Sequence, residues 1–271
     1  MADFAIATIE GEKLGMNLVP DMLTVSFSSP DYIGHQVGAQ SREIHDIYLR
    51  LDLELQRFFK YLDKKFGMGN VIIFLTADHG AADIPAYVKS NTGYYSESKI
   101  KAQFNRALEK EFGFAGIIEN ISNLQIFMNH AIVDKNKIDL KRLLEICKRN
   151  IDSLQGIYDV MLAADLGQCA WVKRECELMR NGYNPRRSGD LILASQPGWI
   201  GEGYIQGGTT HGSPFTYDTH VPLLWLGWRI RKGISYQRTE IPDIAPTLAL
   251  LLGCTAPNGA SGNPIYTLLE K

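Results

Sequence analysis

The sequence predicts an α/β fold, and three observations lead to that prediction. Short apolar runs alternate with amphipathic stretches along most of the chain, as strands and helices alternate in α/β proteins. Hydrophobic residues make up 45% of the 271 positions and charged residues 21%, a balance that buries a large core and excludes extended disorder. No repeat or linker-like stretch interrupts the pattern. We therefore predict a single domain over residues 1–271, with an insertion around 84–185.

Five short apolar runs are predicted to be strands: Leu23 to Phe27, Val71 to Leu75, Leu124 to Met128, Asp190 to Ala194 and Leu223 to Leu226. The clearest helix covers about Ser41 to Phe66, where the apolar residues form one stripe at helical spacing. Ser41 suits its N-cap, and Gly67 suits the position just past its end. Further helices are predicted over Lys99 to Phe112, after Asp139, and from Asp243 to a stop at Gly253.

Charge and apolar run length exclude two classes of protein. The formal net charge is −2, without the excess of positive charge that is typical of proteins that bind nucleic-acid polymers. Every apolar run is shorter than the roughly 18 residues of a membrane helix, so no membrane span is expected. The N-terminal residues lack the basic-then-apolar pattern of an export signal. This is the pattern expected of a sequence that starts at an internal position. The four cysteines show no zinc-type spacing and fit either buried thiols or one or two disulfides.

Three segments place acids or histidines after predicted strands or in a glycine-flanked loop. Asp31 and His35 follow the first strand, Asp78 and His79 follow the second, and His211 lies between glycines in a loop. Ligands of open α/β sheets bind beyond the carboxyl ends of strands, so these side chains are expected to meet there. Carboxylate and imidazole ligands suit zinc best, with manganese and iron as weaker candidates.

Each of these motifs has a simpler interpretation when it is taken alone. An isolated Asp–Pro or Asp–His pair is more often a turn or cap residue than a ligand. The joint placement of Asp31, His35, Asp78, His79 and His211 after strands favours a metal site over that interpretation.

The same segments resemble a known family. Thr24 to His35 (TVSFSSPDYIGH), Phe74 to Gly80 (FLTADHG) and Thr210 to Pro214 (THGSP) look like motifs of the alkaline phosphatase superfamily. Most similar is its branch of single-chain bacterial alkaline phosphatases related to type I phosphodiesterases and nucleotide pyrophosphatases. Asn184 to Asp190 and Tyr217 to Pro222 also resemble that branch, so the resemblance spans nearly the whole chain.

This resemblance implies a mostly parallel sheet flanked by helices on both faces, with the metal motifs at one sheet edge. It assigns Asp31, His35 and His211 to a first zinc ion, and Asp78 and His79 to a second. In the family such a pair clamps a phosphoryl group, and a Ser or Thr nucleophile attacks phosphorus. The substrate would be a phosphate monoester, and the protein would be periplasmic or secreted.

The segment that carries this nucleophile in the family, with a further zinc-ligating Asp, has no counterpart before Asp31. The chain therefore resembles a C-terminal portion of the enzyme. We expect it to be inactive or weakly active, to hold about one zinc ion, and to self-associate through an exposed sheet edge.

Two alternative functions stay open. A phosphodiesterase or nucleotide pyrophosphatase would share the same metal ligands, since the groups that separate monoesters from diesters lie mostly elsewhere. A non-catalytic metal-binding domain is the alternative from outside the enzymes.

Overall fold

The computed structural model describes residues 1–269, which divide into two compact units. The first, here called the terminal unit, contains residues 1–30, 45–78 and those from 221 onward. The second, the central unit, contains residues 31–44 and 79–220. Each unit is described by itself. The single domain with an insertion around 84–185 stays a prediction.

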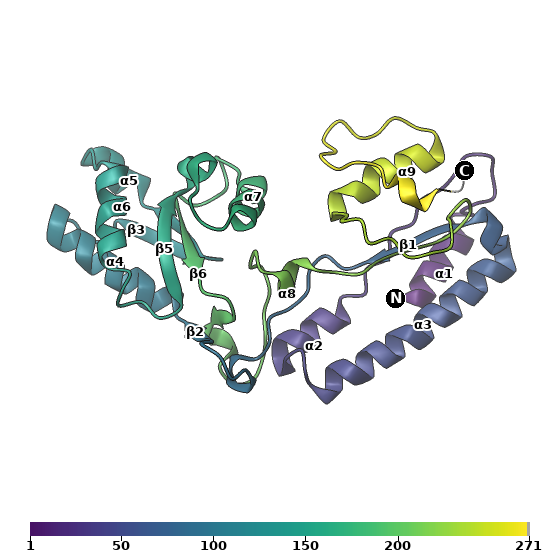
Figure 1. Cartoon of the computed structure of the whole chain (residues 1–271), viewed down its shortest axis with the longest axis horizontal. Coiled ribbons are helices and arrows are strands. Elements are labelled where there is room, and N and C mark those ends of the chain that lie inside the picture. Colours follow the sequence, from purple (N-terminus) through teal and green to yellow (C-terminus); the bar gives the residue numbers. More distant parts are fainter. Residues whose placement is uncertain (270–271) are drawn as a thin grey trace. The chain divides into compact units, whose positions relative to one another are not determined.

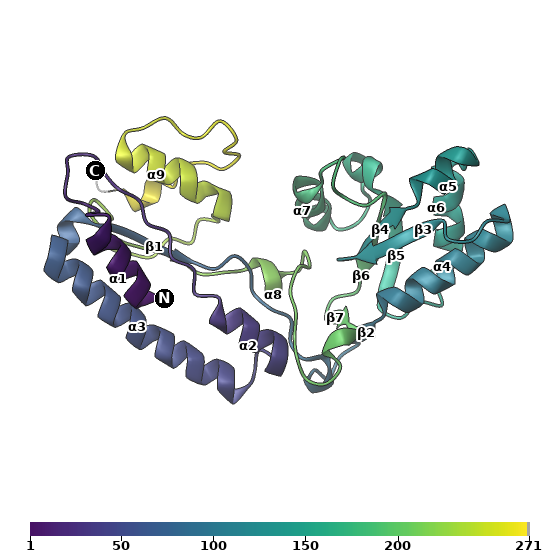
Figure 2. The same ribbon diagram turned by 180° about the vertical axis from the view of Figure 1, so that it is seen from behind.

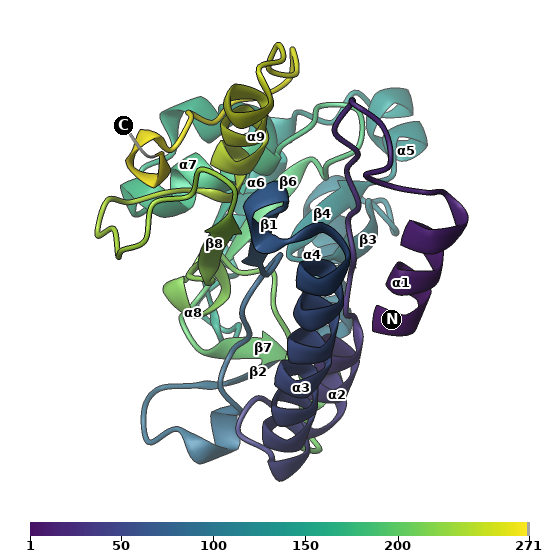
Figure 3. The same ribbon diagram turned by 90° about the vertical axis from the view of Figure 1, so that its right-hand side faces the viewer.

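The terminal unit combines three helices with a two-stranded antiparallel sheet. Helix α1 (Ala2–Gly11) packs on α3 (Arg42–Phe66), with Ala5 and Ile9 buried against Phe58 and Leu62 (Figure 2). Strand β1 (Ile72–Thr76) pairs with β8 (Leu223–Gly227), and Figure 3 shows the two strands side by side. Helix α9 (Ile244–Leu252) follows β8 in the sequence.

Local sequence signals set the ends of two of these helices as predicted. The Ser41 hydroxyl accepts a hydrogen bond from the backbone N–H of Ile44 at 3.1 Å, which satisfies one of the free N–H groups in the first turn of α3. Gly253 ends α9 in the left-handed conformation, with φ of 67°, where glycine has no Cβ to clash.

The central unit is built on a four-stranded sheet with the order β3–β4–β6–β5. These strands are β3 (Ile118–Ser122), β4 (Gln125–Met128), β5 (Ile157–Leu162) and β6 (Leu191–Ser195). One face is covered by α4 (Glu97–Phe112), α5 (His130–Lys135) and α6 (Leu140–Arg149) (Figure 1). The other face packs against the segment that includes α7 (Lys173–Gly182). Helices on both faces were expected, and this sheet has them.

The prediction of a mostly parallel sheet is wrong for the described strands. All pairs in the four-stranded sheet are antiparallel, as is β1 with β8. The parallel pair is short: β2 (Gly93–Tyr95) with β7 (Trp199–Gly201). One local cause is the tight turn between β3 and β4, in which Asn123 and Leu124 both have positive φ. Such turns join antiparallel strands in a hairpin.

The first predicted strand is also wrong. Residues 23–27 have no regular secondary structure, although Val25 packs against the α1–α3 core. An extended segment becomes a strand only through hydrogen bonds to a neighbour, and no described strand pairs with this one. The residues that follow form helix α2 (Ser29–Val37). The other four predicted strands and all four predicted helices are confirmed, with ends shifted by a few residues.

The remaining features are short elements and one disulfide. Helix α8 covers Thr216–Thr219, and 3-10 turns lie at Met68–Asn70, Pro85–Tyr87, Ala163–Gln168, Glu202–Tyr204, Ile241–Asp243 and Tyr266–Leu268. Cys169 and Cys176 form a disulfide, while Cys147 is a buried thiol and Cys254 an exposed one. Among the described residues, no helix is long and apolar enough to span a membrane.

Candidate metal centre

Helix α2 supplies two of the predicted ligands. Asp31 lies in its first turn and His35 in its last, four residues apart, so both side chains project from the same face of the helix. The sequence analysis expected them to meet beyond the carboxyl end of a strand. The structure brings them together by helical periodicity instead, with Asp31 Oδ1 3.3 Å from His35 Nε2.

The glycine-rich segment that carries His211 is held against α2 through Thr209. The Thr209 N–H donates to the carbonyl of Gly34 at 3.2 Å, and the buried Thr209 hydroxyl donates to the carbonyl of Ala82. A Cβ on Gly208 would lie 2.0 Å from the carbonyl oxygen of His35. Only glycine at position 208 lets the two backbones approach this closely.

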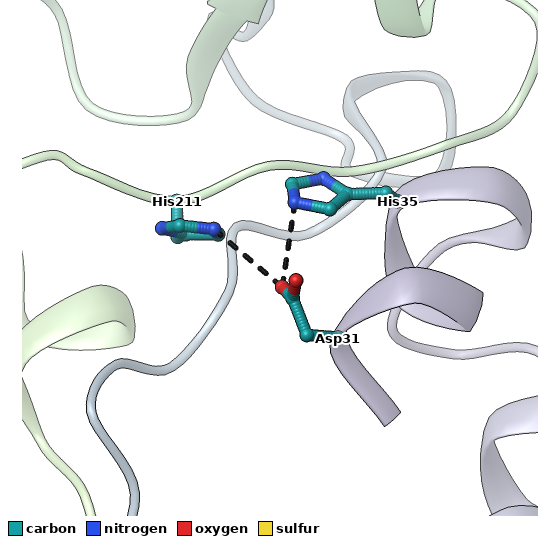
Figure 4. Close-up of side chains that lie close together, drawn as sticks. All are labelled: Asp31, His35 and His211. Atoms are coloured by element: carbon teal, nitrogen blue, oxygen red, sulfur yellow. Dashed lines mark ion pairs between the residues drawn. The ribbon is translucent and has the colours of Figure 1, made fainter. Parts of the chain in front are cut away.

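Three side chains meet as a result of this packing (Figure 4). One ligand atom from each of Asp31, His35 and His211 lies within 4.8 Å of the others, and His211 Nε2 is 3.5 Å from Asp31 Oδ1. Two ligands of a tetrahedral zinc ion, each about 2.1 Å from the metal, lie roughly 3.4 Å apart. The separations of 3.3 and 3.5 Å therefore fit a shared metal ion.

The hydrogen bonding of His35 also suits a ligand. Its Nδ1 lies 2.9 Å from the carbonyl oxygen of Thr209, and a carbonyl can only accept, so Nδ1 carries the proton. In a neutral ring the Nε2 lone pair then faces the carboxylate of Asp31, and two lone pairs at 3.3 Å repel. A metal ion held between these two groups would replace this repulsion by two favourable bonds.

His79 lies beside the same cluster. Its Nδ1 donates to the carbonyl of Gly80 at 2.8 Å, its Nε2 is 3.8 Å from Asp31 Oδ1, and its ring stacks on His211 with 3.3 Å between centroids. His79 thus has the same arrangement as His35, with Nδ1 bound to a backbone carbonyl and Nε2 turned toward Asp31. Asp78, which ends a segment of the terminal unit two residues after β1, stays a predicted ligand.

The environment keeps the His211 imidazole neutral. Burial lowers the pKa of His211 below its usual value of 6.5, and the neighbouring imidazole of His79 lowers it further. Desolvation and a second nearby ring both disfavour the charged form. His211 is therefore unprotonated at neutral pH, the form in which imidazole binds a metal ion.

Two residues that organise the centre were not found from the sequence. Thr209 was passed over as part of a glycine-rich loop, although the glycine pair before it was a signal of close backbone contact. Asp218 was noted only within a family-like stretch, yet it is almost fully buried and accepts two hydrogen bonds from Ser213. Thr76, the last residue of β1, donates its hydroxyl hydrogen bond to the carbonyl of Pro222 at 2.8 Å.

Comparison with known proteins places this geometry in a family. The sequence profile described as type I phosphodiesterase / nucleotide pyrophosphatase matches residues 6–217, a range that includes Asp31, His35, Asp78, His79 and His211. The chain therefore belongs to the type I phosphodiesterase/nucleotide pyrophosphatase family, as the sequence motifs implied.

Within this family the chain is similar to bacterial alkaline phosphatases. It is 37% identical over 274 residues to alkaline phosphatase PafA of Elizabethkingia meningoseptica, covering 100% of this chain and 49% of PafA. The crystal structure of PafA matches with a TM-score of 0.93 and 35% identity, over 99% of this chain and 52% of that one. A Myroides odoratus protein named as a calcium-transporting ATPase is 38% identical over 274 residues, 99% of this chain and 50% of that protein. The chain spans about half the length of the curated relatives it matches.

Proposed function

We propose that this chain forms the metal-binding part of a zinc-dependent phosphomonoester hydrolase of the alkaline phosphatase type. The observation that carries the proposal is the convergence of Asp31, His35 and His211 on one point with separations that suit zinc. A set of one carboxylate and two imidazoles leaves a coordination position open, as catalytic zinc requires. The similarity to alkaline phosphatases over half their length supports the choice of reaction.

The residues of the centre have separable roles in this proposal. Asp31 contributes negative charge, and the bond from His35 to Thr209 fixes the ring so that Nε2 is offered to the metal. A bound zinc ion would polarise a phosphoryl oxygen and lower the pKa of a water ligand. We further propose Asp78 and His79 as ligands of a second zinc ion; the bond from His79 Nδ1 to the carbonyl of Gly80, which fixes the ring as the bond to Thr209 fixes His35, supports the assignment of His79.

A phosphodiesterase or nucleotide pyrophosphatase activity is the second candidate, and the description of the matching family favours it. The rates of hydrolysis of p-nitrophenyl phosphate and of bis-p-nitrophenyl phosphate, measured side by side, would separate the two. A monoester enzyme has Lys or Arg side chains for the extra negative charge of its substrate.

A periplasmic or secreted location is also a proposal, and the disulfide between Cys169 and Cys176 supports it, since disulfides persist in oxidising compartments.

Metal stoichiometry tests the proposed centre directly. The 271-residue chain dialysed against zinc should retain about one zinc ion, measured by elemental analysis, because Asp78 and His79 alone supply only two ligands and would hold a second ion weakly. His211→Ala should lose it, because the site then keeps two ligands. Asp78→Ala should retain most of it, because Asp78 is not among the three converging ligands.

His130→Ala is the matched control. His130 also lies close to a carboxylate, with Nε2 3.1 Å from Asp190 Oδ1, but it belongs to α5 and not to the cluster. Its loss should leave the zinc content unchanged. Two tightly held zinc ions in the unaltered chain, or zinc retained by His211→Ala, would show that the ligands are wrongly assigned.

A further inference from the structure

The loops that carry His79 and His211 are both tied to one short element of the central unit, helix α8. The backbone N–H of Gly80, the residue after His79, donates to the carbonyl of Asp218 at 2.7 Å. The backbone N–H and the hydroxyl of Ser213, two residues after His211, donate to Asp218 Oδ2 at 2.7 and 2.6 Å. Asp218 is therefore the common partner of the two histidine loops, through its main chain for one and its carboxylate for the other.

Close packing makes this connection rigid. A Cβ on Gly80 would lie 2.1 Å from the carbonyl oxygen of Tyr217, so the His79 loop touches the backbone of α8 directly. Asp218 itself is 4% exposed. A small displacement of α8 would therefore move Gly80, since there is no free space between the two backbones.

The burial of the Asp218 carboxylate is costly and needs an explanation. Its Oδ2 accepts both bonds from Ser213, while its Oδ1 is buried with no hydrogen-bond partner among the described residues. Burying a carboxylate with an unpaired oxygen is unfavourable. An aspartate with no role beyond the short helix α8 would be expected at the surface, where both oxygens are hydrated.

We propose that Asp218 is a positioning residue of the metal centre: its carboxylate anchors the loop after His211, its carbonyl anchors the loop after His79, and together they hold the two imidazoles stacked beside Asp31. The inference rests on the proposed metal-binding function for its functional meaning, but the positioning itself is a property of the metal-free chain.

The test uses Co²⁺ as a spectroscopic probe, together with NMR of the histidine rings in the metal-free chain. Asp218→Ala should weaken Co²⁺ binding by about 10- to 100-fold, the usual effect of losing a group that orients a ligand. In the metal-free chain, it should shift the ring-proton resonances of His79 and His211 as their stacking is lost, and those of His35 much less. Asp218→Asn keeps an acceptor oxygen for Ser213 and should recover most of the affinity.

Asp190→Ala is the matched control for a general loss of stability. The Asp190 carboxylate also anchors a backbone N–H in the central unit, that of Met128 at 2.8 Å, but it serves the four-stranded sheet. This variant should lose stability without changing Co²⁺ affinity or the His79 and His211 resonances.

Each outcome decides the matter. A folded Asp218→Ala chain with unchanged Co²⁺ affinity and unchanged ring resonances overturns the proposal. If Asp218→Ala does not fold, Ser213→Ala replaces it. That variant removes one hydrogen bond, about 1 kcal/mol or fivefold in affinity, and unchanged resonances there overturn the proposal equally. If the unaltered chain binds no Co²⁺, the proposed metal function fails, and the ring resonances of the variants still decide whether Asp218 positions the histidines.

Discussion

At the scale of single residues, two histidines of the metal centre owe their orientation to main-chain carbonyl groups. Thr209 holds His35 through its carbonyl oxygen, and Gly80 does the same for His79. Because a carbonyl group is present whatever the side chain, the tautomer of each ring depends on where the backbone lies rather than on a neighbouring side chain. Substitutions that move these backbones should therefore act on the centre as strongly as changes near the ligands.

A buried thiol should make the central unit sensitive to high pH. Burial raises the pKa of Cys147 from 9.0 to about 12, because the thiolate is poorly solvated in the core. With the folded-state pKa above the unfolded value, the neutral thiol stabilises the fold fully below pH 9, and this contribution is lost as pH rises toward 12. The midpoint of urea unfolding should therefore fall between about pH 9 and about pH 11.

Two variants separate the effect of Cys147 from that of other groups that titrate in the same range. One such group is Tyr95, because burial also raises its pKa to about 12. Cys147→Ala should flatten the pH dependence of the midpoint, although its stability at neutral pH is lower. Cys254→Ala, which removes the exposed thiol, should follow the unaltered chain. Equal slopes in Cys147→Ala and the unaltered chain would contradict the assignment.

At the scale of elements, the core of the central unit depends on α4. Its apolar residues Ile100, Phe104 and Leu108 recur at helical spacing and are buried against the four-stranded sheet and α6. Ser96 caps the first turn by accepting from the Lys99 N–H, and Gly113 ends the helix in the left-handed conformation. Propensity, capping and the apolar stripe all favour the same helix, so this element was predictable from the sequence.

Truncation of Phe104 should be among the most damaging changes in this unit. Phe104 is fully buried, and Phe104→Ala should reduce the free energy of unfolding by about 3–5 kcal/mol, through lost burial and the cavity left behind. Phe114→Ala removes the same kind of side chain from a position that is 40% exposed. It should change the free energy of unfolding by about 0.5 kcal/mol or less. Urea unfolding followed by circular dichroism measures the free energy of unfolding of both variants. Equal losses in Phe104→Ala and Phe114→Ala would show that Phe104 is not a central residue of the core.

At the scale of the whole molecule, the chain spans about half the length of its relatives, and we expect its catalytic centre to be incomplete. Asp31, His35 and His211 form one candidate metal site, whereas the nucleophile that the family resemblance implies matches none of the proposed site residues. Self-association also stays a prediction; within the described residues, β1 and β8 each have a single partner strand, which leaves one edge of each strand unpaired.

The 271-residue chain supplied with zinc should therefore hydrolyse p-nitrophenyl phosphate negligibly. A bound zinc ion without a positioned nucleophile activates at most a water molecule. A chain that holds one zinc ion also lacks the second metal that clamps the phosphoryl group. Release of p-nitrophenol, followed by absorbance, gives the measurement, with His211→Ala as the metal-free reference. Robust turnover that Asp78→Ala abolishes would show that the chain holds a complete two-metal centre.

The sequence by itself determined the elements whose signals are local. Helices α3, α4, α6 and α9 were predicted from apolar spacing and from caps such as Ser41 and Gly253, because each helix is stabilised by hydrogen bonds between residues close in the chain. The convergence of Asp31, His35 and His211 was also predicted, since their residue types and motifs can be recognised in the sequence. The resemblance to the family followed from the same motifs.

The tertiary structure decided everything that depends on which distant segments meet. Apart from the β3–β4 hairpin, strand direction in the four-stranded sheet depends on hydrogen bonds between strands far apart in the sequence. The absence of a strand at residues 23–27 depends in the same way on partners that no local pattern specifies. Thr209 and Asp218 gained their importance in the same way, because each bonds to segments more than a hundred residues away. A short polar residue in a loop carries no sign of its partners until the chain is folded around it.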